Sequence, residues 1–312
     1  MYKIKSPVLF IIFNRPDCTS KVFEEIKKGK PEKLYISADG PRDSNFMDFE
    51  LCRRAKEVLK IDWDCQVKTL YQEKNLGCKK AVSTGIKWFF ENELEGIILE
   101  DDCLPNQAFF RFCDLLLEKY RDDSRIVHIS GTKINIDKEF GNATYYFSKY
   151  TNIWGWASWR RVWKHYDENL SLLDDFINED IFQYVYERAD IREFLTKSLQ
   201  KTAVDEINTW DYQYAFLNFW NNGLCICPNF NLISNIGFNE DATHTTNPHH
   251  IYANLPHQSL DEIIHPRFFL PRLDADYLLL DREIPSRFQK NILIAKGIVK
   301  RILKYINGII QP

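Results

Sequence analysis

The 312-residue chain lacks several features that would assign it to other classes of protein. Its eight cysteines include no Cys-x-x-Cys pair, so the sequence indicates neither a zinc site nor a thioredoxin-like redox motif. The net charge of −3 argues against a partner made of nucleic acid. No internal repeat or low-complexity segment is evident. Unpaired cysteines of this kind fit a reducing cytosol, so we expect a cytoplasmic protein.

Long apolar runs are also missing near the N-terminus. The first run covers only Val8–Phe13, which is too short to span a membrane, and no small-residue cleavage site follows it. We therefore interpret this run as the first strand. Aromatic residues, by contrast, are abundant, with 22 Phe, 15 Tyr and 8 Trp. Such rings suit stacking on sugars or bases, although most of them are expected in the hydrophobic core.

Short apolar runs alternate with helical patterns through the first half of the chain. After the first strand, Asp17 is a candidate N-cap for a helix with Val22, Phe23 and Ile26 on its buried face. Further strands are expected at 34–38, 67–71, 96–100 and 125–130, with helices between them. This alternation predicts an α/β fold with a mostly parallel sheet and helices on both faces. Helices are expected from 170 to 201 and from about 210 to 220, followed by a strand at 224–228.

Three consecutive carboxylates, Glu100, Asp101 and Asp102, end one of the apolar runs. The carboxyl ends of parallel strands border the crevice in which open α/β sheets bind ligands. Adjacent carboxylates repel one another and are commonly held together by a cation, most simply a divalent ion with oxygen ligands. The alternative is a solvated acidic turn before the next helix.

Several motifs resemble, in their order, those of N-acetylglucosaminyltransferase I and of bacterial sugar transferases in the same GT-A superfamily. Each motif is weak alone, and the resemblance rests on the ordered set, which spans roughly residues 6–245. The set comprises Phe13-Asn-Arg-Pro16, Asp39-Gly40, Glu100-Asp101-Asp102, Trp154-Gly-Trp-Ala-Ser-Trp159, Trp210-Asp211, Gly223-Leu-Cys-Ile-Cys-Pro228 and Ile236-Gly237.

The resemblance implies a GT-A, Rossmann-like fold and a site for a UDP-sugar. Asp102 would contact Mn²⁺ or Mg²⁺, and Glu100 and Asp101 would face the ribose or the donor sugar. A divalent ion suits this position because it binds oxygen and neutralises the charge of a departing diphosphate. Asp39 would accept the imide N–H of uracil, unless it is a turn carboxylate ahead of Gly40.

Basic residues near these acids are candidates for binding the nucleotide. Arg15 would face phosphate or base carbonyl oxygens, since a guanidinium suits both, and its alternative is a surface ion pair. Lys79 and Lys80 begin a helix and could approach the diphosphate. At least one of these two lysines is expected on a solvated helix face, and Lys80 is the candidate for nucleotide binding.

The resemblance assigns the catalytic base to Asp211. This carboxylate would take the proton from the acceptor hydroxyl while that oxygen attacks the anomeric carbon, which inverts its configuration. A helix cap is the alternative role, and the two are compatible because a residue at a helix start points toward a crevice.

Trp154, Trp156 and Trp159 would line the acceptor or donor pocket, with a Trp-rich core as the alternative. His244 would contribute to the same pocket, as a metal ligand or a nucleotide contact in a lid. His249 and His250 are expected to be ordinary loop residues.

We expect one glycosyltransferase domain over residues 1–250, with a nucleotide-binding half at 1–131 and an acceptor and catalytic-base half at 132–250. Residues 251–312 would form a C-terminal extension. Its last part, 290–310, carries apolar residues at helical spacing together with lysines and an arginine, which predicts a basic amphipathic helix. Such a helix could lie on an anionic membrane surface, on its own domain or on a partner.

The sequence therefore predicts a metal-dependent, inverting glycosyltransferase. It would move a sugar, expected to be an N-acetylhexosamine, from a UDP-sugar to a glycan or lipid-linked acceptor of bacterial surface-polysaccharide synthesis, in the cytoplasm or at the inner membrane face. A nucleotidyltransferase or nucleotide-sugar hydrolase is one alternative, although Asn14-Arg15-Pro16-Asp17 is a poor match to a glycine-rich phosphate loop. An inactive nucleotide- or glycan-binding module is another.

Overall fold

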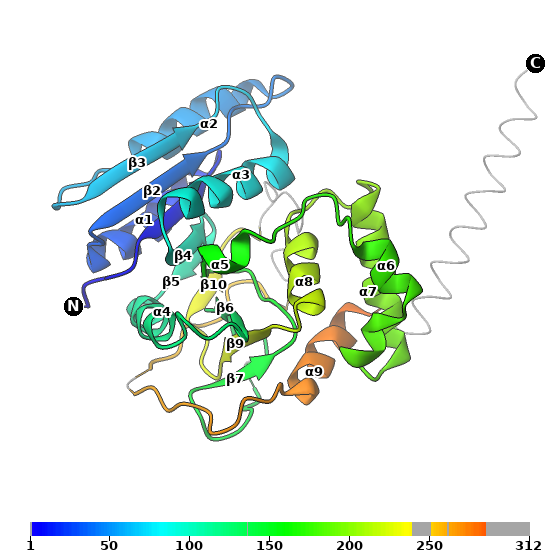
Figure 1. Ribbon diagram of the computed structural model, residues 1–312. Helices are drawn as coiled ribbons and strands as arrows, with labels where there is room; N and C mark the ends of the chain where they lie inside the picture. Colours follow the sequence, from blue (N-terminus) through cyan, green and yellow to red (C-terminus); the bar gives the residue numbers. More distant parts are fainter. Residues whose placement is uncertain (1, 136, 239–250, 261, 285–312) are drawn as a thin grey trace, which may run out of the picture.

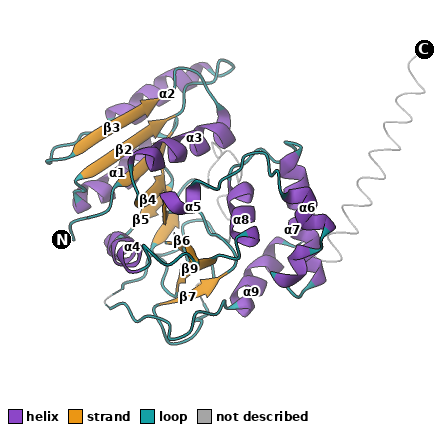
Figure 2. Cartoon of the chain, viewed as in Figure 1, coloured by secondary structure: helices purple, strands orange, loops and turns teal. Residues whose placement is uncertain are grey.

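The computed structural model describes residues 2–135, 137–238, 251–260 and 262–284. In these ranges the strands are β1 (Val8–Ile12), β2 (Lys33–Ala38), β3 (Gln66–Tyr71), β4 (Glu95–Glu100), β5 (Cys103–Pro105), β6 (Ile126–Ser130), β7 (Tyr145–Ser148), β8 (Trp156–Trp159), β9 (Leu224–Pro228) and β10 (Ile233–Asn235). The helices are α1 (Pro16–Gly29), α2 (Phe46–Glu57), α3 (Gly77–Asn92), α4 (Gln107–Lys119), α5 (Arg160–Trp163), α6 (Leu173–Asn178), a 3-10 helix (Ile181–Tyr184), α7 (Ala189–Ala203), α8 (Asp211–Trp220) and α9 (Leu273–Glu283). Strands and helices alternate from β1 to β4, as the sequence pattern predicts (Figure 2).

Eight strands form one sheet in the order β3-β2-β1-β4-β8-β6-β9-β7 (Figure 1). The pairs β1–β2, β1–β4, β2–β3 and β6–β9 are parallel. β8 runs antiparallel to both of its neighbours, and β7 runs antiparallel to β9. β5 and β10 form a separate antiparallel pair. The predicted mostly parallel α/β sheet is confirmed.

Helices cover both faces of this sheet. α1 packs against α2 and α4, and α3 packs on β1 and β2 and contacts α5 (Figure 1). Val22, Phe23 and Ile26 of α1 are buried, as their spacing predicts. The predicted N-cap Asp17 is wrong, however, because α1 begins at Pro16 with Arg15 before it. Proline needs no N–H partner at the first helical position and therefore favours an earlier start.

The order of the strands reverses beside β1. The chain runs outward from β1 to β2 and β3, and α3 then returns it to β4 on the other side of β1. Such a switch point separates the connections that follow β1 and β4, and ligands of open α/β sheets bind in the crevice it leaves. Arg15 follows β1 and Glu100 ends β4, so both lie at this edge.

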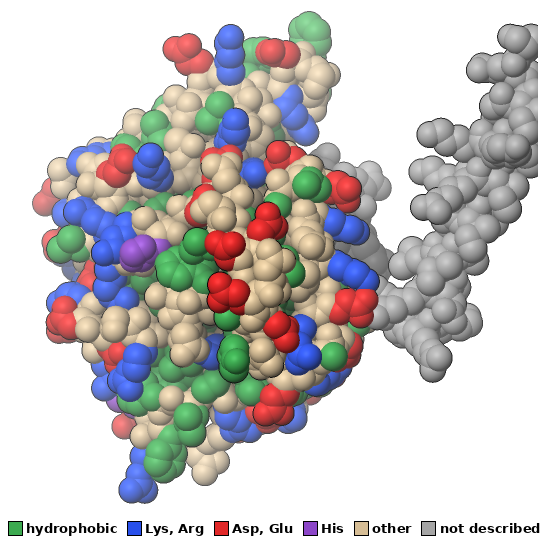
Figure 3. All heavy atoms as spheres, turned by 45° about the vertical axis from the view of Figure 1, so that its right-hand side comes forward, with side chains coloured by type: hydrophobic (Ala, Val, Ile, Leu, Met, Phe, Trp, Pro, Cys, Tyr) green, Lys and Arg blue, Asp and Glu red, His purple; other side chains and the backbone are tan. Residues whose placement is uncertain are grey.

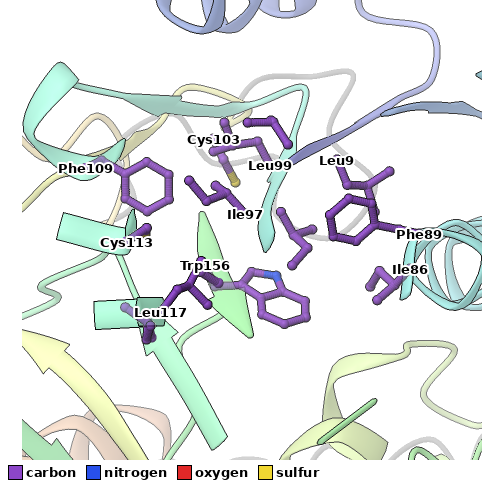
Figure 4. Packing of buried hydrophobic residues seen from close by; sticks show 14 of the residues in the cluster. Leu9, Ile86, Phe89, Ile97, Leu99, Cys103, Phe109, Cys113, Leu117 and Trp156 are labelled. Atoms are coloured by element: carbon purple, nitrogen blue, oxygen red, sulfur yellow. The ribbon is translucent and has the colours of Figure 1, made fainter. Parts of the chain in front are cut away.

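The motif Trp154–Trp159 forms the middle of the sheet, a position that the sequence pattern does not predict. Its last four residues are β8, which lies between β4 and β6. Trp156 is buried in the core, in the region shown in Figure 4, and its ring packs on those of His128 and Tyr214. Gly155, just before β8, has a φ of +61°, and a Cβ there would lie 2.4 Å from Ile233 Cδ1. Glycine is therefore required where β8 approaches β10.

A second hydrophobic cluster joins the helices from α6 to α9. Its buried members include Phe176 of α6, Leu195 of α7, Phe216 and Phe219 of α8 and Leu280 of α9. This cluster accounts for the predicted helices between 170 and 220. Tyr214 and Leu217 of α8 belong to the main core instead, so α8, whose first residue is Asp211, is anchored to the sheet as well as to the helical cluster.

The described part of the predicted C-terminal extension packs on both sheets. The main-chain N–H of Asn254 donates to the carbonyl of Asn235 at 3.0 Å, and that of Arg272 donates to the carbonyl of Phe147 at 2.7 Å. The amphipathic helix expected at 290–310 lies outside the described residues. Within the described ranges, no helix has the length and hydrophobicity needed to cross a bilayer. Acidic and basic side chains intermix over the face in Figure 3.

Candidate functional site

A cavity of about 340 Å³ lies at the switch point of the sheet. It brings Glu100 and Asp102, which follow β4, to the same space as Asp211 at the start of α8. The side chains that line this first cavity are Arg15, Cys78, Glu100, Asp102, Ile153, Trp154, Ile207, Thr209, Trp210, Asp211, Tyr212, Asn235, Gly237 and Phe238. Carboxylates that are distant in the sequence thus face one another across one cavity.

Arg15 bridges two of the three consecutive acids. Its Nη1 donates to Oδ2 of Asp102 at 2.9 Å, and its Nη2 donates to Oδ1 of Asp101. Asp101 is 1% exposed, and its Oδ2 accepts the main-chain N–H of Phe13 at 3.1 Å. Asp101 therefore holds Arg15 and the end of β1 in place, while Asp102 stays at the cavity wall.

Glu100 carries the clearest electrostatic signature of the cavity. Desolvation by the surrounding protein, followed by the charges of Asp102 and Asp101, raises its pKa to about 8, and Arg15 only partly opposes this shift. Among the described side chains that line the first cavity, Arg15 is the basic one, against three carboxylates. The site is therefore deficient in positive charge.

This charge deficit fits a divalent cation. Glu100 and Asp102 offer hard oxygen donors, the kind that Mn²⁺ and Mg²⁺ prefer. Asp102 Oδ2 is occupied by Arg15, and Asp102 Oδ1 lies 3.4 Å from the thiol of Cys103. In the described ranges no group of three His, Cys, Asp or Glu side chains is arranged to hold a metal. A cation would thus depend on ligand oxygens to complete its coordination.

Asp211 is held from one side of its carboxylate. Oδ1 accepts the hydroxyl of Thr209 and the main-chain N–H of Tyr212, the latter at 2.9 Å. No hydrogen bond to Oδ2 is formed by the residues that the structure describes. Asp211 is the first residue of α8 and also lines the first cavity. The predicted position at a helix start and the position at a cavity therefore occur together.

The three tryptophans of the motif at 154–159 occupy two different environments, the first cavity and the hydrophobic core. Trp154 lines the first cavity and forms edge contacts with Phe238, at a ring-centroid distance of 5.6 Å, and with Tyr252. Trp156 and Trp159 are each 1% exposed and belong to the hydrophobic core. Three residues apart along β8, they lie on opposite faces of a sheet that is covered on both sides. The structure therefore brings only Trp154 to the cavity.

Asp39 lies in an adjoining cavity of about 170 Å³, shared with Arg15, Glu100 and Cys78. Its carboxylate already accepts four hydrogen bonds, from the N–H groups of Gly40, Leu76 and Gly77 and from the side chain of Asn75, at 2.8 to 3.1 Å. Burial raises the pKa of Asp39 even though the main-chain bonds lower it. Four bonds use the usual accepting capacity of a carboxylate, so Asp39 ties the end of β2 to the start of α3.

The adjoining cavity contains a basic residue that the sequence analysis missed. Arg42 lines it and is fixed by the fully buried Asp48, whose carboxylate accepts from Nε of Arg42 at 2.5 Å and from Nη2 at 2.9 Å. Asn14 donates to the same carboxylate at 2.8 Å. The only sequence signal is the position of Arg42 just beyond the end of β2.

The two lysines at the start of α3 do not approach the first cavity. Lys79 pairs with Asp205 at 2.9 Å. Lys80 is exposed and lies outside the lining of both cavities described above. A solvated face is thus its observed position. His244 lies outside the described residues.

No protein-family model matches the chain, and no curated protein matches it. Solved structures with partial similarity include a mannosyltransferase from Pyrobaculum calidifontis in complex with GDP-Man and Mn²⁺, at 13% identity and a TM-score of 0.35. That match covers 51% of this chain and 46% of the mannosyltransferase, so this chain spans about half of its length.

A UDP-glucose pyrophosphorylase complexed with UDP-glucose is similar at 10% identity and a TM-score of 0.40, over 75% of this chain and 93% of that one. A cytidylyltransferase from Leptospira borgpetersenii matches at 11% identity and a TM-score of 0.31, over 56% and 65% of the two chains. Matches of this extent do not assign an activity. The resemblance to N-acetylglucosaminyltransferase I stays a prediction.

Proposed function

We propose that this protein is a metal-dependent, inverting glycosyltransferase that uses a nucleoside diphosphate sugar. The observation that supports this proposal is the shared cavity, in which Asp102 and Glu100 on the sheet side face Asp211 on the helix side. Single-displacement glycosyl transfer needs charge compensation for the leaving group and one base for the acceptor. The lining of the cavity contains a candidate residue for each of these two functions.

On the donor side, Arg15 places a guanidinium at the end of β1, where it would counter the charge of the diphosphate. Arg42 lines the adjoining cavity and would contact the nucleotide there. When bound, Mn²⁺ or Mg²⁺ would be held by Asp102, with Glu100 beside it, and would neutralise the leaving diphosphate. Asp39 has no accepting capacity left for a uracil N–H, so we give it a structural role.

On the acceptor side, Oδ2 of Asp211 accepts the proton of the acceptor hydroxyl. The hydroxyl oxygen forms a bond to the anomeric carbon as the bond from that carbon to the diphosphate oxygen breaks. The electron pair leaves with the diphosphate. Because Thr209 and Tyr212 hold Oδ1 of Asp211, the orientation of the carboxylate is fixed and Oδ2 is left for the acceptor hydroxyl.

A UDP-N-acetylhexosamine is the donor that we expect first, with a glycan or lipid-linked acceptor. The decisive experiment measures the melting temperature of the full chain with UDP, with and without Mn²⁺. We expect stabilisation by UDP only in the presence of the metal, and its loss in Asp102→Ala. Equal stabilisation without Mn²⁺ would remove the metal-diphosphate part of the proposal.

The same preparation is then incubated with UDP-N-acetylglucosamine, UDP-N-acetylgalactosamine, UDP-glucose and GDP-mannose. Transfer of the sugar to an added acceptor that requires Asp211 supports glycosyl transfer. Formation of a UDP-sugar from UTP and a sugar phosphate would instead assign a nucleotidyltransferase. Release of free sugar that continues unchanged when acceptors are added would assign a hydrolase.

A further inference from the structure

A second cavity, of about 240 Å³, continues from the first one on the far side of Asp211. The two cavities share four lining residues: Ile153, Trp154, Asp211 and Tyr212. The remaining lining residues of the second cavity are Ile134, Tyr150, Thr151, Asn152, Ala215, Tyr252, Leu279 and Glu283. A molecule in this second cavity would therefore meet the same carboxylate that faces the donor side.

The lining of the second cavity combines aromatic rings with negative charge. Tyr150, Tyr212 and Tyr252 join Trp154 around it, and Asp211 and Glu283 supply two carboxylates. The described lining residues include no lysine or arginine, and the nearby Arg282 of α9 hydrogen-bonds to Tyr252 from outside the lining. Aromatic faces pack on the C–H faces of sugar rings, and carboxylates accept hydrogen bonds from sugar hydroxyls. Phosphate and carboxylate groups would be repelled in the same place.

The pKa values of two tyrosines in the lining are raised, in part by these carboxylates. Burial is the largest cause that raises the pKa of Tyr150 far above its usual range, and the nearby Tyr212, Asp211, Glu283 and Tyr252 add to it. Burial also raises the pKa of Tyr212, with Asp211 and Glu283 contributing and a hydrogen bond with Ser198 opposing the rise. Asp211 and Glu283 thus act on the same phenols from two different helices.

Helix α9, which carries Glu283, is fixed to the sheet by a buried carboxylate. Asp276 is 2% exposed and accepts the hydroxyl of Ser148 at 2.5 Å and the main-chain N–H of Lys149 at 2.9 Å. Leu280, one turn further along, is fully buried against the helical cluster. Asp276, Leu280 and Glu283 follow one another at helical spacing, so the anchor also sets the position of Glu283 at the cavity.

We infer that the second cavity binds the acceptor as a saccharide unit without an anionic group, and that Glu283 excludes acidic sugars from it. This inference rests on the proposed function, because it assigns the acceptor side of the same site. It also gives the C-terminal segment a role in specificity, since α9 belongs to the part of the chain beyond residue 250.

Saturation-transfer NMR on the full chain, with UDP and Mn²⁺ present, tests the inference. The probes are methyl β-galactopyranoside, methyl N-acetyl-β-glucosaminide and methyl β-glucuronide. We expect saturation on the two neutral glycosides and little on the glucuronide. In Glu283→Gln, the signal of the glucuronide relative to the galactoside should rise about fivefold, because one repelling charge is removed.

Glu187→Gln is the matched control, since Glu187 is exposed and lies outside the second cavity. Its signal ratio should equal that of the unmodified chain.

Three outcomes would each overturn the inference: binding of the glucuronide as well as the neutral glycosides, no binding of the neutral glycosides, or an unchanged ratio in Glu283→Gln. UDP-dependent melting is recorded in parallel: if UDP binds normally, the acceptor assignment alone has failed, whereas loss of UDP binding in the unmodified chain would remove the proposed function itself.

Discussion

Gly237 lies directly against Asp102. A Cβ at position 237 would come within 2.3 Å of Asp102 Oδ2 and within 2.8 Å of Arg15 Nη1. Gly237 follows β10, and its N–H donates to the side chain of Asn235 at 2.9 Å. The close approach of this backbone closes one wall of the first cavity around the pair of Asp102 and Arg15.

The first prediction concerns this contact. Gly237→Ala should push Asp102 away from Arg15 and weaken metal-dependent UDP binding roughly tenfold, measured by titration calorimetry. Gly141→Ala is the control, because Gly141 has a φ of +79° and so loses stability on substitution but does not line the cavity. UDP affinity that is unchanged in Gly237→Ala would show that this wall does not position Asp102.

The second prediction concerns the buried ion pair. Arg15→Ala leaves Asp101 buried without its cation and should lower the free energy of unfolding by about 3–5 kcal/mol in urea titrations. Adding Asp101→Asn should recover part of this loss, since the stranded charge is removed. Arg53→Ala, which breaks the exposed pairs with Glu50 and Glu57, should cost less than about 1 kcal/mol. If the double variant recovers none of the lost free energy of unfolding, an unpaired Asp101 charge is not the cause of the loss.

The third prediction concerns Asp211. Asp211→Asn keeps an oxygen for Thr209 and Tyr212 but loses the base, so transfer should fall by roughly 10² to 10⁴ while UDP binding persists. Initial rates with saturating donor measure the effect. Asp205→Asn, at an exposed residue paired with Lys79, serves as the control. Transfer at the normal rate in Asp211→Asn would exclude Asp211 as the base.

The fourth prediction separates the tryptophans. Trp156→Ala should lower the free energy of unfolding by about 3–5 kcal/mol, because Trp156 is buried on β8 and stacks on Trp210 at 5.8 Å. Trp154→Ala should cost less stability, since Trp154 is only partly buried, and should raise the KM of a substrate instead. Comparable stability losses with no change in KM would place Trp154 among the purely structural residues.

The fifth prediction concerns pH. His128 is fully buried on β6, its Nε2 donates to the carbonyl of Asn152 at 2.9 Å, and burial lowers its pKa to about 4. The unfolded chain, with a histidine pKa near its usual value of about 6.5, takes up the proton first as the pH falls. The contribution of His128 to stability is therefore complete above pH ~6.5 and decreases from there toward pH ~4.

Between pH 7.5 and 5.0 this loss should reach about 2 kcal/mol. His128→Gln, which retains a donor for Asn152, should lose correspondingly less stability over the same interval in urea titrations. His165→Gln, at an exposed histidine, should match the unmodified chain. An identical pH dependence in His128→Gln would mean that His128 is not held neutral by the fold.

Local patterns determined the elements that frame the site. The apolar runs of β1, β2 and β4 are short and end at polar residues, so the sequence predicts that Arg15, Asp39 and Glu100 lie at or just after the ends of strands. The alternation of strands and helices likewise predicted the mostly parallel sheet. Strand formation and turn formation depend mainly on neighbouring residues, so the local pattern of apolar and polar residues predicts them directly.

Tertiary packing decided which groups meet. The cavity shared by Asp102 and Asp211, the bridge from Arg15 to Asp101 and the burial of Trp156 on a central strand all join residues distant in the chain. The saturated carboxylate of Asp39 and the position of Glu283 on α9 are of the same kind. The sequence by itself determined where carboxylates and rings follow strands and begin helices. Only the folded chain decided which oxygens are occupied and which face a cavity, because hydrogen-bond partners and burial depend on contacts between distant segments.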